Sequence, residues 1–218
     1  MALVSLDGEA LGWGDEIVLP DLTFRIERGE HVAILGRSGV GKSTLLKALS
    51  ERTTAQRIAL VPQDAGLVDS LSVFHNAWMG RLGDAGALTN LRILIHPGRA
   101  RREEVDQVLG KVGLSGFGRR KVDSLSGGQR QRVSLARALL RGGDILLADE
   151  PVSAVDPEQG AALLAQIRVR FDTSVVILHD AALARRHATR LVGLEAGRIV
   201  VNGPPADTAD AALAGLYG

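Results

Sequence analysis

One short stretch, Gly36-Arg37-Ser38-Gly39-Val40-Gly41-Lys42-Ser43, constrains the fold more than any other part of the sequence. It lies between the apolar run 32–35 and a segment, 45–49, whose apolar residues recur at helical spacing. This order predicts a buried strand, a glycine-rich loop and a helix. The glycines allow the backbone to wrap a phosphate, and the helix N-terminus offers N–H donors to it. In that setting Lys42 is expected to reach the β- and γ-phosphates of a nucleotide, and the Ser43 hydroxyl to ligate Mg²⁺.

Other apolar runs predict the sheet to which this loop belongs. Continuous runs of four or five apolar residues suit parallel strands that helices cover on both faces, and they occur at 58–61, 145–148 and 174–178. More alternating segments suit an antiparallel edge or a small subsidiary sheet, and they occur at 2–6, 22–26, 191–194 and 199–201. The expected fold class is therefore α/β.

Between residues 64 and 128 the sequence changes character. Strand-like runs are rare there, and the segment 99–112 places Val105, Val108, Leu109 and Val112 on one helical stripe. We interpret 65–133 as a helical subdomain inserted into an α/β core that comprises 1–64 and 134–218. The whole chain, 1–218, is then one domain.

Charge and hydropathy argue against a nucleic-acid-binding surface and against a membrane-spanning segment. The formal net charge is +1, from 26 basic and 25 acidic residues, so no nucleic-acid-binding surface is expected. The basic cluster 99–102 precedes Glu103 and Glu104, as at a solvated helix start. No apolar run approaches the ~20 residues of a membrane span, and no secretory signal is evident. The absence of cysteine fits a reducing compartment. A cytosolic chain that reaches a membrane only through a partner is expected.

The run 145–148 ends in two carboxylates, Asp149 and Glu150. Open α/β sheets bind ligands at the carboxyl ends of their strands, so both side chains are expected beside the phosphate loop. Asp149 would hold Mg²⁺ through water, and Glu150 would orient and deprotonate an attacking water molecule. Taken alone, the pair could equally be an acidic turn before Pro151.

A second glycine pair stands in the segment Leu125-Ser126-Gly127-Gly128-Gln129. Ser126 and Gln129 have the spacing of a capping box, which predicts the start of a helix over 130–140. A capped helix start with two glycines is also a site for an anion. Because the phosphate loop already covers one side of the nucleotide, this second surface would most simply face a nucleotide held by another chain.

These motifs occur in the order seen in ATP-binding cassette (ABC) ATPases, which the chain resembles over nearly its whole length. The resemblance implies a P-loop NTPase fold: a RecA-like parallel sheet core with a subsidiary antiparallel sheet and an inserted helical subdomain. It implies ATP hydrolysis with ATP and Mg²⁺ as cofactors. It also implies a head-to-tail dimer, either a homodimer or a cassette heterodimer, closed by ATP. The motifs that carry the resemblance are 36–43, Gln63, 125–129, 145–150, 153–156 and His179.

The resemblance also assigns roles to single residues. Gln63 is implied to contact Mg²⁺ and the attacking water, His179 the γ-phosphate, and Asp156 the partner across the dimer. Trp13 stands where the family carries an aromatic residue that stacks on adenine, although it could be an ordinary packed tryptophan. The implied catalytic residues are Lys42, Gln63, Glu150 and His179, and the implied metal ligands are Ser43, Gln63 and Asp149. The implied nucleotide contacts are Trp13, Gly36, Arg37, Ser38, Gly39, Val40, Gly41, Lys42, Ser43, Thr44, Gln63, Ser126, Gly127, Gly128, Gln129, Asp156 and His179.

Within the family, the segments 61–73 and 76–83 are similar to those of phosphonate-import ATPases. This implies a peripheral subunit at the cytoplasmic face of the inner membrane, coupled to integral membrane subunits and, through them, to a solute-binding protein. Leu67, Val73, Trp78 and Met79 are candidates either for the membrane-subunit contact or for core packing. A soluble cassette of the repair or translation type and an exporter half are the alternatives. The connection 48–62 is shorter than is usual in the family, which leaves open how large the subsidiary sheet is and how firmly it holds Trp13.

Overall fold

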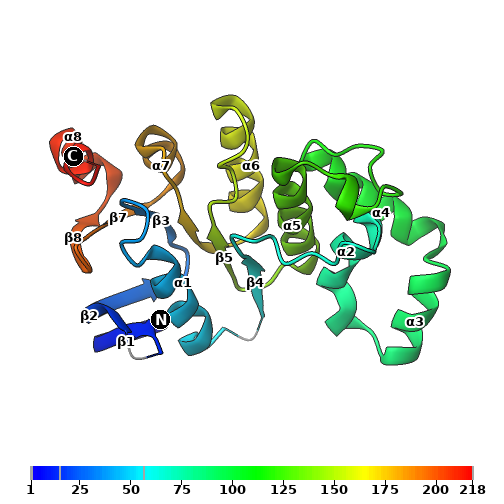
Figure 1. The fold of residues 1–218 in the computed structure, drawn as a ribbon, viewed down its shortest axis with the longest axis horizontal. Helices are drawn as coiled ribbons and strands as arrows, with labels where there is room; N and C mark the ends of the chain where they lie inside the picture. The colour runs from blue at the N-terminus through cyan, green and yellow to red at the C-terminus, as the bar shows by residue number, and fades with distance from the viewer. Residues whose placement is uncertain (1, 15, 56, 218) are drawn as a thin grey trace.

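A six-stranded sheet runs through the centre of the computed structural model, which describes residues 2–14, 16–55 and 57–217 (Figure 1). Its strand order is β4-β5-β6-β3-β7-β8, and only the edge strand β8 is antiparallel to its neighbour. The strands are β3 (His31–Leu35), β4 (Ile58–Val61), β5 (Ile145–Asp149), β6 (Thr173–Ile177), β7 (Arg190–Glu195) and β8 (Arg198–Gly203).

Both faces of this sheet are buried, as the continuous apolar runs predict. Alternate residues of β3 enter two different apolar clusters: Val32 and Ile34 face one side of the sheet, and Ala33 and Leu35 face the other. The first cluster includes α1 (Lys42–Arg52), and the second includes α6 (Pro157–Arg170), α7 (Ala181–His187) and α8 (Asp210–Gly215). Burial of each such aliphatic side chain contributes about 1.5–3 kcal/mol, so covering both faces stabilises the parallel core.

The predicted subsidiary sheet is present. It consists of the antiparallel pair β1 (Ala2–Trp13) and β2 (Glu16–Glu27), in which Leu6 lies opposite Phe24. Its apolar side packs in the same cluster as α1. The short connection that follows α1 is tied to this sheet, because the Thr54 N–H donates to the Leu3 carbonyl at 2.9 Å. Gln56 of that connection lies outside the described residues.

The last two strands form an antiparallel pair, but only one of them lies at an edge. The alternating pattern of 191–194 predicted an edge or a subsidiary sheet, and this prediction was wrong for β7. β7 lies inside the main sheet, parallel to β3, and its residues Leu191, Val192 and Leu194 are buried. β8 closes the sheet as the antiparallel edge strand.

The segment after β4 forms a mainly helical lobe, on the right in Figure 1. The predicted stripe lies on α4 (Gly98–Lys111) and its C-cap: Val105, Leu109 and Val112 are buried, and Val108 is half-buried. Val73 is also fully buried, which favours core packing over partner contact. The proposed boundary at residue 133 falls inside one continuous helix, α5. The elements of the lobe are α2 (Val73–Trp78), η1 (Met79–Asp84), α3 (Ala87–Ile95), α4 (Gly98–Lys111), η2 (Val122–Ser124) and α5 (Gly127–Arg141).

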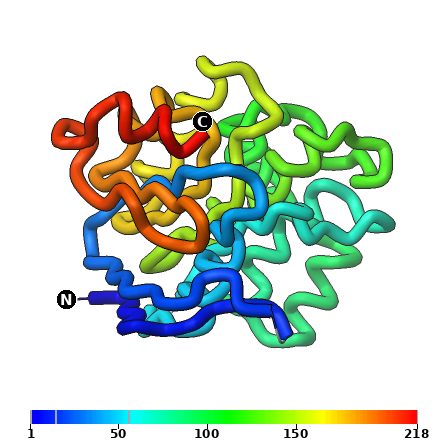
Figure 2. Tube along the Cα trace, turned by 60° about the vertical axis from the view of Figure 1, so that its left-hand side comes forward, coloured from blue at the N-terminus to red at the C-terminus, as the bar shows by residue number. Residues whose placement is uncertain are grey.

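The C-terminal turn lies next to the glycine-rich loop that follows β3. Arg37 Nη2 donates to the carbonyl oxygen of Tyr217 at 3.2 Å, and Figure 2 shows the red end of the chain beside the blue loop. In the described part of the chain, no helix is both long and apolar enough to cross a bilayer.

Candidate functional site

The glycine-rich loop joins β3 to α1 through conformations that only glycine adopts easily. Gly36 has a φ of 142°, and a Cβ placed there would lie 2.4 Å from the carbonyl oxygen of Leu194. Gly41 is the left-handed N-cap of α1, and its position supplies no side-chain cap. The first N–H groups of α1 are therefore available to an anion, which is what a phosphate-binding loop requires.

Lys42 is held inside this loop. Its side chain is 6% exposed, and Nζ donates to the carbonyl oxygens of Gly36 and Arg37 at 2.8 and 2.7 Å. Burial lowers the pKa of Lys42, and the negative charges of Glu150 and Asp149 oppose that shift. A buried ammonium that donates to these backbone carbonyls rather than to a carboxylate is well suited to bind the oxygens of a phosphate chain.

Ser43 and Asp149 meet where the loop passes the end of β5. Ser43 Oγ donates to Asp149 Oδ2 at 2.7 Å, and burial raises the pKa of the Asp149 carboxyl. Hydroxyl and carboxylate oxygens are the hard ligands that Mg²⁺ prefers. Among the described residues no group of three or more His, Cys, Asp or Glu side chains forms a metal cage. The two oxygens present, from Ser43 and Asp149, fit Mg²⁺, an ion that usually keeps several waters and takes further ligands from phosphate groups.

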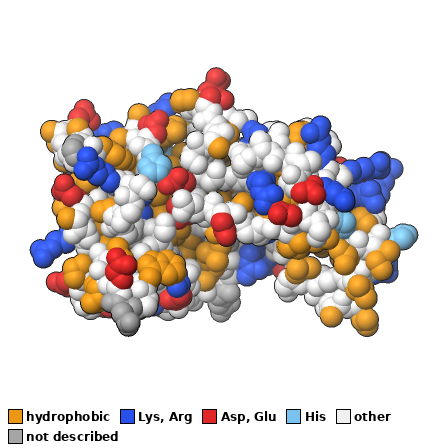
Figure 3. Space-filling model, viewed as in Figure 1, with side chains coloured by type: hydrophobic (Ala, Val, Ile, Leu, Met, Phe, Trp, Pro, Cys, Tyr) orange, Lys and Arg blue, Asp and Glu red, His pale blue; other side chains and the backbone are white. Residues whose placement is uncertain are grey.

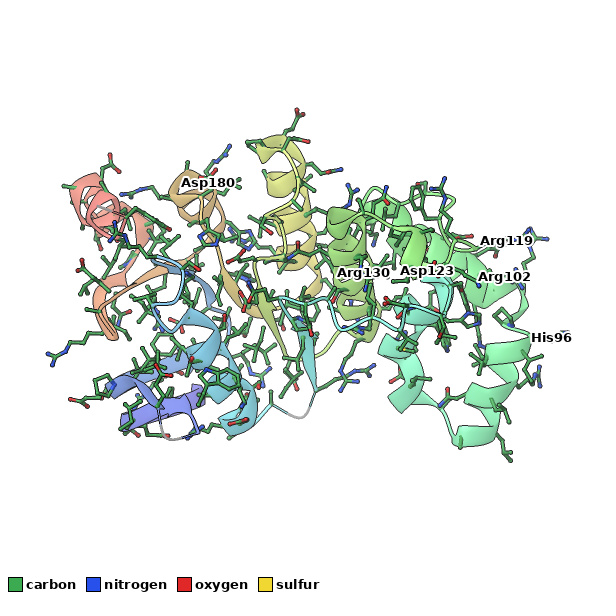
Figure 4. The ribbon with its side chains drawn as sticks, viewed as in Figure 1. His96, Arg102, Arg119, Asp123, Arg130 and Asp180 are labelled. Carbon is green, nitrogen blue, oxygen red and sulfur yellow. The ribbon has the colours of Figure 1, made fainter. Side chains whose placement is uncertain are left out.

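Glu150 and His179 are paired at the same edge of the sheet. Because β5 and β6 are neighbours, with Asp149 opposite Ile177, the residues that follow them come together. His179 Nε2 and Glu150 Oε1 form a hydrogen bond, and the Glu150 side chain is 22% exposed. Glu150 is one of the few described non-glycine residues with a positive φ, 50°. Asp180, labelled in Figure 4 at the start of α7, caps that helix through the N–H groups of Ala182 and Leu183.

Gln63 follows β4, the strand next to β5, and its side chain is exposed. The loop just beyond it contains two residues with positive φ, Ala65 at 62° and Gly66 at 53°. Arg137 of α5 donates to both of their carbonyl oxygens, at 2.9 and 2.5 Å. These two hydrogen bonds could not be predicted from the sequence, because no local motif links an arginine in the middle of a helix to a loop about 70 residues earlier.

Trp13 lies at the end of β1 and is anchored to α1. Its indole Nε1 donates to Thr44 Oγ1 at 2.8 Å, and Lys47 Nζ lies 4.0 Å from the ring centroid. The side chain is nevertheless 52% exposed. These contacts hold Trp13 next to the phosphate loop even though the connection after α1 is short. Its stacking on adenine stays a prediction.

The capping box at the start of α5 is confirmed. Ser126 Oγ accepts from the Gln129 N–H, and Gln129 Oε1 accepts from the Ser126 N–H. A Cβ added at Gly127 would meet nothing within 4 Å, so this turn presents an open backbone surface. Arg130, one turn further, forms an ion pair with Asp69 at 2.6 Å and is labelled in Figure 4.

The chain does not bring this capped turn to its own phosphate loop. The loop follows β3, whereas α5 packs on the edge strand β4. Three strand spacings separate β3 from β4, a distance of about 14 Å. Asp156, also predicted as a site residue, is exposed and caps α6 by accepting from the Gln159 N–H at 2.9 Å. The two glycine surfaces thus lie on separate parts of the same molecule.

Comparison with known proteins supports the same interpretation. Residues 19–153 match the model of the ABC transporter family. The chain is 39% identical to the phosphonates import ATP-binding protein PhnC 1 of Natronomonas pharaonis, over 94% of each chain. It is 38% identical to the PhnC protein of Frankia casuarinae, over 93% of this chain and 90% of the relative.

Solved structures give the same fold. The dimeric post-hydrolysis structure of the ATP-binding cassette MJ0796, bound to ADP and Pi, superposes with a TM-score of 0.78 at 27% identity, covering 93% of this chain and 98% of that one. A bacterial Atm1-family ABC exporter with ATP bound superposes at 0.77 and 26% identity, covering 98% of this chain and 41% of that one. The expected P-loop NTPase fold is confirmed. With its phosphate loop, its acidic strand end and its capped glycine turn, the chain belongs to the ABC transporter family, as an ATP-binding and ATP-hydrolysing cassette.

Proposed function

We propose that the chain is the ATPase subunit of an importer for a phosphonate or a related phosphorus oxyanion, bound peripherally at the cytoplasmic face of the membrane. The observation that carries this proposal is the similarity to phosphonates import ATP-binding proteins over 94% of both chains. The arrangement of side chains at the sheet edge supports the hydrolytic part.

In this proposal the chain's own groups bind and orient ATP. The α1 N–H groups and Lys42 Nζ hold the β- and γ-phosphates. Ser43, Asp149 and Gln63 would hold Mg²⁺, which when bound offsets the negative charge on the phosphate oxygens. The Ser43–Asp149 hydrogen bond supports this assignment, because it already joins two of the three side chains.

Hydrolysis then needs one activated water. The Glu150 carboxylate accepts a proton from that water as its oxygen attacks the γ-phosphorus in line with the leaving ADP oxygen. His179 Nε2, which already bonds Glu150 Oε1, orients the carboxylate and faces the γ-phosphate. No covalent intermediate with the protein is required, because positioning and charge stabilisation lower the barrier.

The remaining nucleotide contacts are proposed to come from a second cassette. The capped turn, Ser126 to Gln129, would close on the γ-phosphate held by the partner's phosphate loop. Two observations support this: the open backbone surface at Gly127 and the packing of α5 on the edge strand β4, whereas the phosphate loop follows β3. Asp156 would lie beside the same dimer interface.

The helical lobe is the proposed contact for the membrane subunits. α3 exposes an apolar face at its outer side, and hydrophobic side chains gather at this end of the lobe in Figure 3. Leu88 is 85% exposed and Ile95 66%, whereas Val73 is fully buried. We therefore place the contact on α3 rather than on Val73. Its exposed apolar residues are Leu88, Leu91, Leu94 and Ile95.

Replacement of Glu150 tests the hydrolytic assignment. Glu150→Gln keeps the size of the side chain and removes the base, so kcat should fall by at least about a hundredfold, the usual contribution of such a group. ATP binding should survive, and an ATP-bound dimer should accumulate in size-exclusion chromatography. Turnover at the wild-type level in this variant would contradict the role given to Glu150.

The transport assignment needs a separate experiment. The chain purified with its membrane subunits in vesicles should show ATP hydrolysis that rises when a phosphonate-loaded binding protein is added on the external side. Stimulation by a substrate supplied on the ATP side would instead identify an exporter half, whose fold is equally similar. Purification without any membrane protein would favour a soluble cassette.

A further inference from the structure

Gln131, in the second turn of α5, contacts the turn that carries the catalytic carboxylate. Its Nε2 donates to the backbone carbonyl oxygen of Glu150, and its Oε1 lies 3.3 Å from Ser153 Oγ. The N–H and the hydroxyl of Ser153 also lie within hydrogen-bond distance of the Glu150 carbonyl, at 3.3 and 3.2 Å. The Gln131 amide and Ser153 therefore both place donors within hydrogen-bond distance of the Glu150 carbonyl oxygen.

That carbonyl belongs to a residue in a costly conformation. Glu150 has a φ of 50°, a strained conformation for a non-glycine residue, which persists only where the surrounding structure holds it. The conformation ends β5 and turns the carboxylate toward His179. Because backbone torsion sets the direction of the side chain, donors that fix the Glu150 carbonyl also fix the position of its carboxylate.

The same turn touches α5 a second time, closer to the start of the helix. A Cβ added at Gly128 would lie 2.9 Å from the carbonyl oxygen of Ala154. Gly128 belongs to the capped turn, and Gln131 follows it by three residues on the same helix. Because of this close approach, a movement of the start of α5 also moves the segment 150–154.

We propose that Gln131 is a positioning residue that holds Glu150 in its reactive conformation and links it to the capped turn of the same chain. This inference rests on the proposed function, in which Glu150 serves the chain's own ATP and the capped turn serves the partner's. When the partner's nucleotide binds the capped turn, Gln131 fixes the position of the Glu150 carboxylate, which acts on the chain's own nucleotide.

Gln131→Met tests the proposal, because methionine keeps the length and helical preference of glutamine but removes its amide. The expected result is a fall in kcat of about tenfold, equivalent to 1.36 kcal/mol in the barrier. The KM for ATP should stay within twofold, since the proposal gives Gln131 no contact with the nucleotide. Gln107→Met, at an exposed position of α4, is the matched control and should leave both constants unchanged.

Combination with Glu150→Gln shows whether Gln131 acts through Glu150. In that background Gln131→Met should cause no further loss of residual hydrolysis, and the ATP-bound dimer should form as in the single variant. An unchanged kcat in Gln131→Met, a raised KM, or a further tenfold loss in the double variant would each overturn the proposal. Normal turnover in Glu150→Gln alone would instead overturn the proposed function.

Discussion

His187 is a buried base that the fold keeps neutral. It lies in α7 with 6% of its surface exposed, and its Nε2 has no hydrogen-bond partner among the described residues. Burial lowers its pKa to about 4, with smaller contributions from His31, whose ring centroid is 6.1 Å away, and from Arg168. His31 is also buried, and burial lowers its pKa while its Nδ1 bonds Ser174 Oγ at 2.9 Å.

This burial predicts a loss of stability in mild acid. The unfolded chain binds a proton at His187 near pH 6.5, whereas the folded chain does so only near pH 4. Stability due to the neutral ring is therefore complete above pH 6.5 and falls by roughly 3 kcal/mol as the pH drops to 4. Urea unfolding at several pH values measures this loss.

The matched variants for that measurement are His187→Phe and His96→Gln. His187→Phe keeps a ring of similar size without a titrating group, so the loss of stability between pH 6.5 and 4 should be much smaller. His96→Gln, at an exposed position that Figure 4 shows at the end of α3, is the control for loss of a histidine at the surface. Equal pH dependence in His187→Phe and the wild type would contradict the assignment.

At the scale of elements, η1 and α5 approach each other so closely that only glycine fits between them. A Cβ added at Gly80 would lie 2.3 Å from the carbonyl oxygen of Arg137 and 2.9 Å from the N–H nitrogen of Arg141. Both atoms belong to the backbone of α5, so neither can move aside as the end of a flexible side chain would.

Gly80→Ala should therefore destabilise the protein by about 1–3 kcal/mol, the usual cost of forcing an extra carbon into a packed interface. Gly83, in the same short helix, provides the control, because its nearest neighbour is the end of the Arg141 side chain at 3.9 Å. Thermal unfolding of both variants gives the comparison. A Gly80→Ala protein as stable as Gly83→Ala would show that the two elements separate easily.

The elements differ in how far the sequence could predict them. The strand before Gly36, the capping box at Ser126 and the stripe on α4 were predictable, because each follows from neighbours in the sequence. The interior place of β7 was not, since its pairing with β3 joins residues about 160 positions apart. The contacts of Gln131 with Glu150 and of Arg137 with Ala65 share that property. Hydrogen bonds between side chains and elements far apart in the sequence leave no local sequence pattern.

At the scale of the molecule, the two glycine surfaces lie on separate elements, and we propose that they are two halves of a nucleotide site. Lys42, Asp149 and Glu150 gather at the carboxyl ends of the central strands, whereas the capped turn begins α5, which packs on the edge strand β4. Two copies arranged head to tail would complete two sites at once. The similar cassette MJ0796 is dimeric, which agrees with the pairing of two cassettes.

Ser126→Arg tests the assembly, because a long cation at the capped turn should block the approach of a second chain, and the capped turn belongs to a different element from the phosphate loop. In the Glu150→Gln background, the ATP-dependent dimer should weaken at least tenfold, about 1.4 kcal/mol, in analytical ultracentrifugation. The Kd of the monomer for ATP should not change. Ser124→Arg, also exposed but outside the capped turn, should still dimerise. If Ser126→Arg weakened ATP binding by the monomer as much as dimer formation, the capped turn would act on its own chain's nucleotide, and the head-to-tail assembly would be wrong.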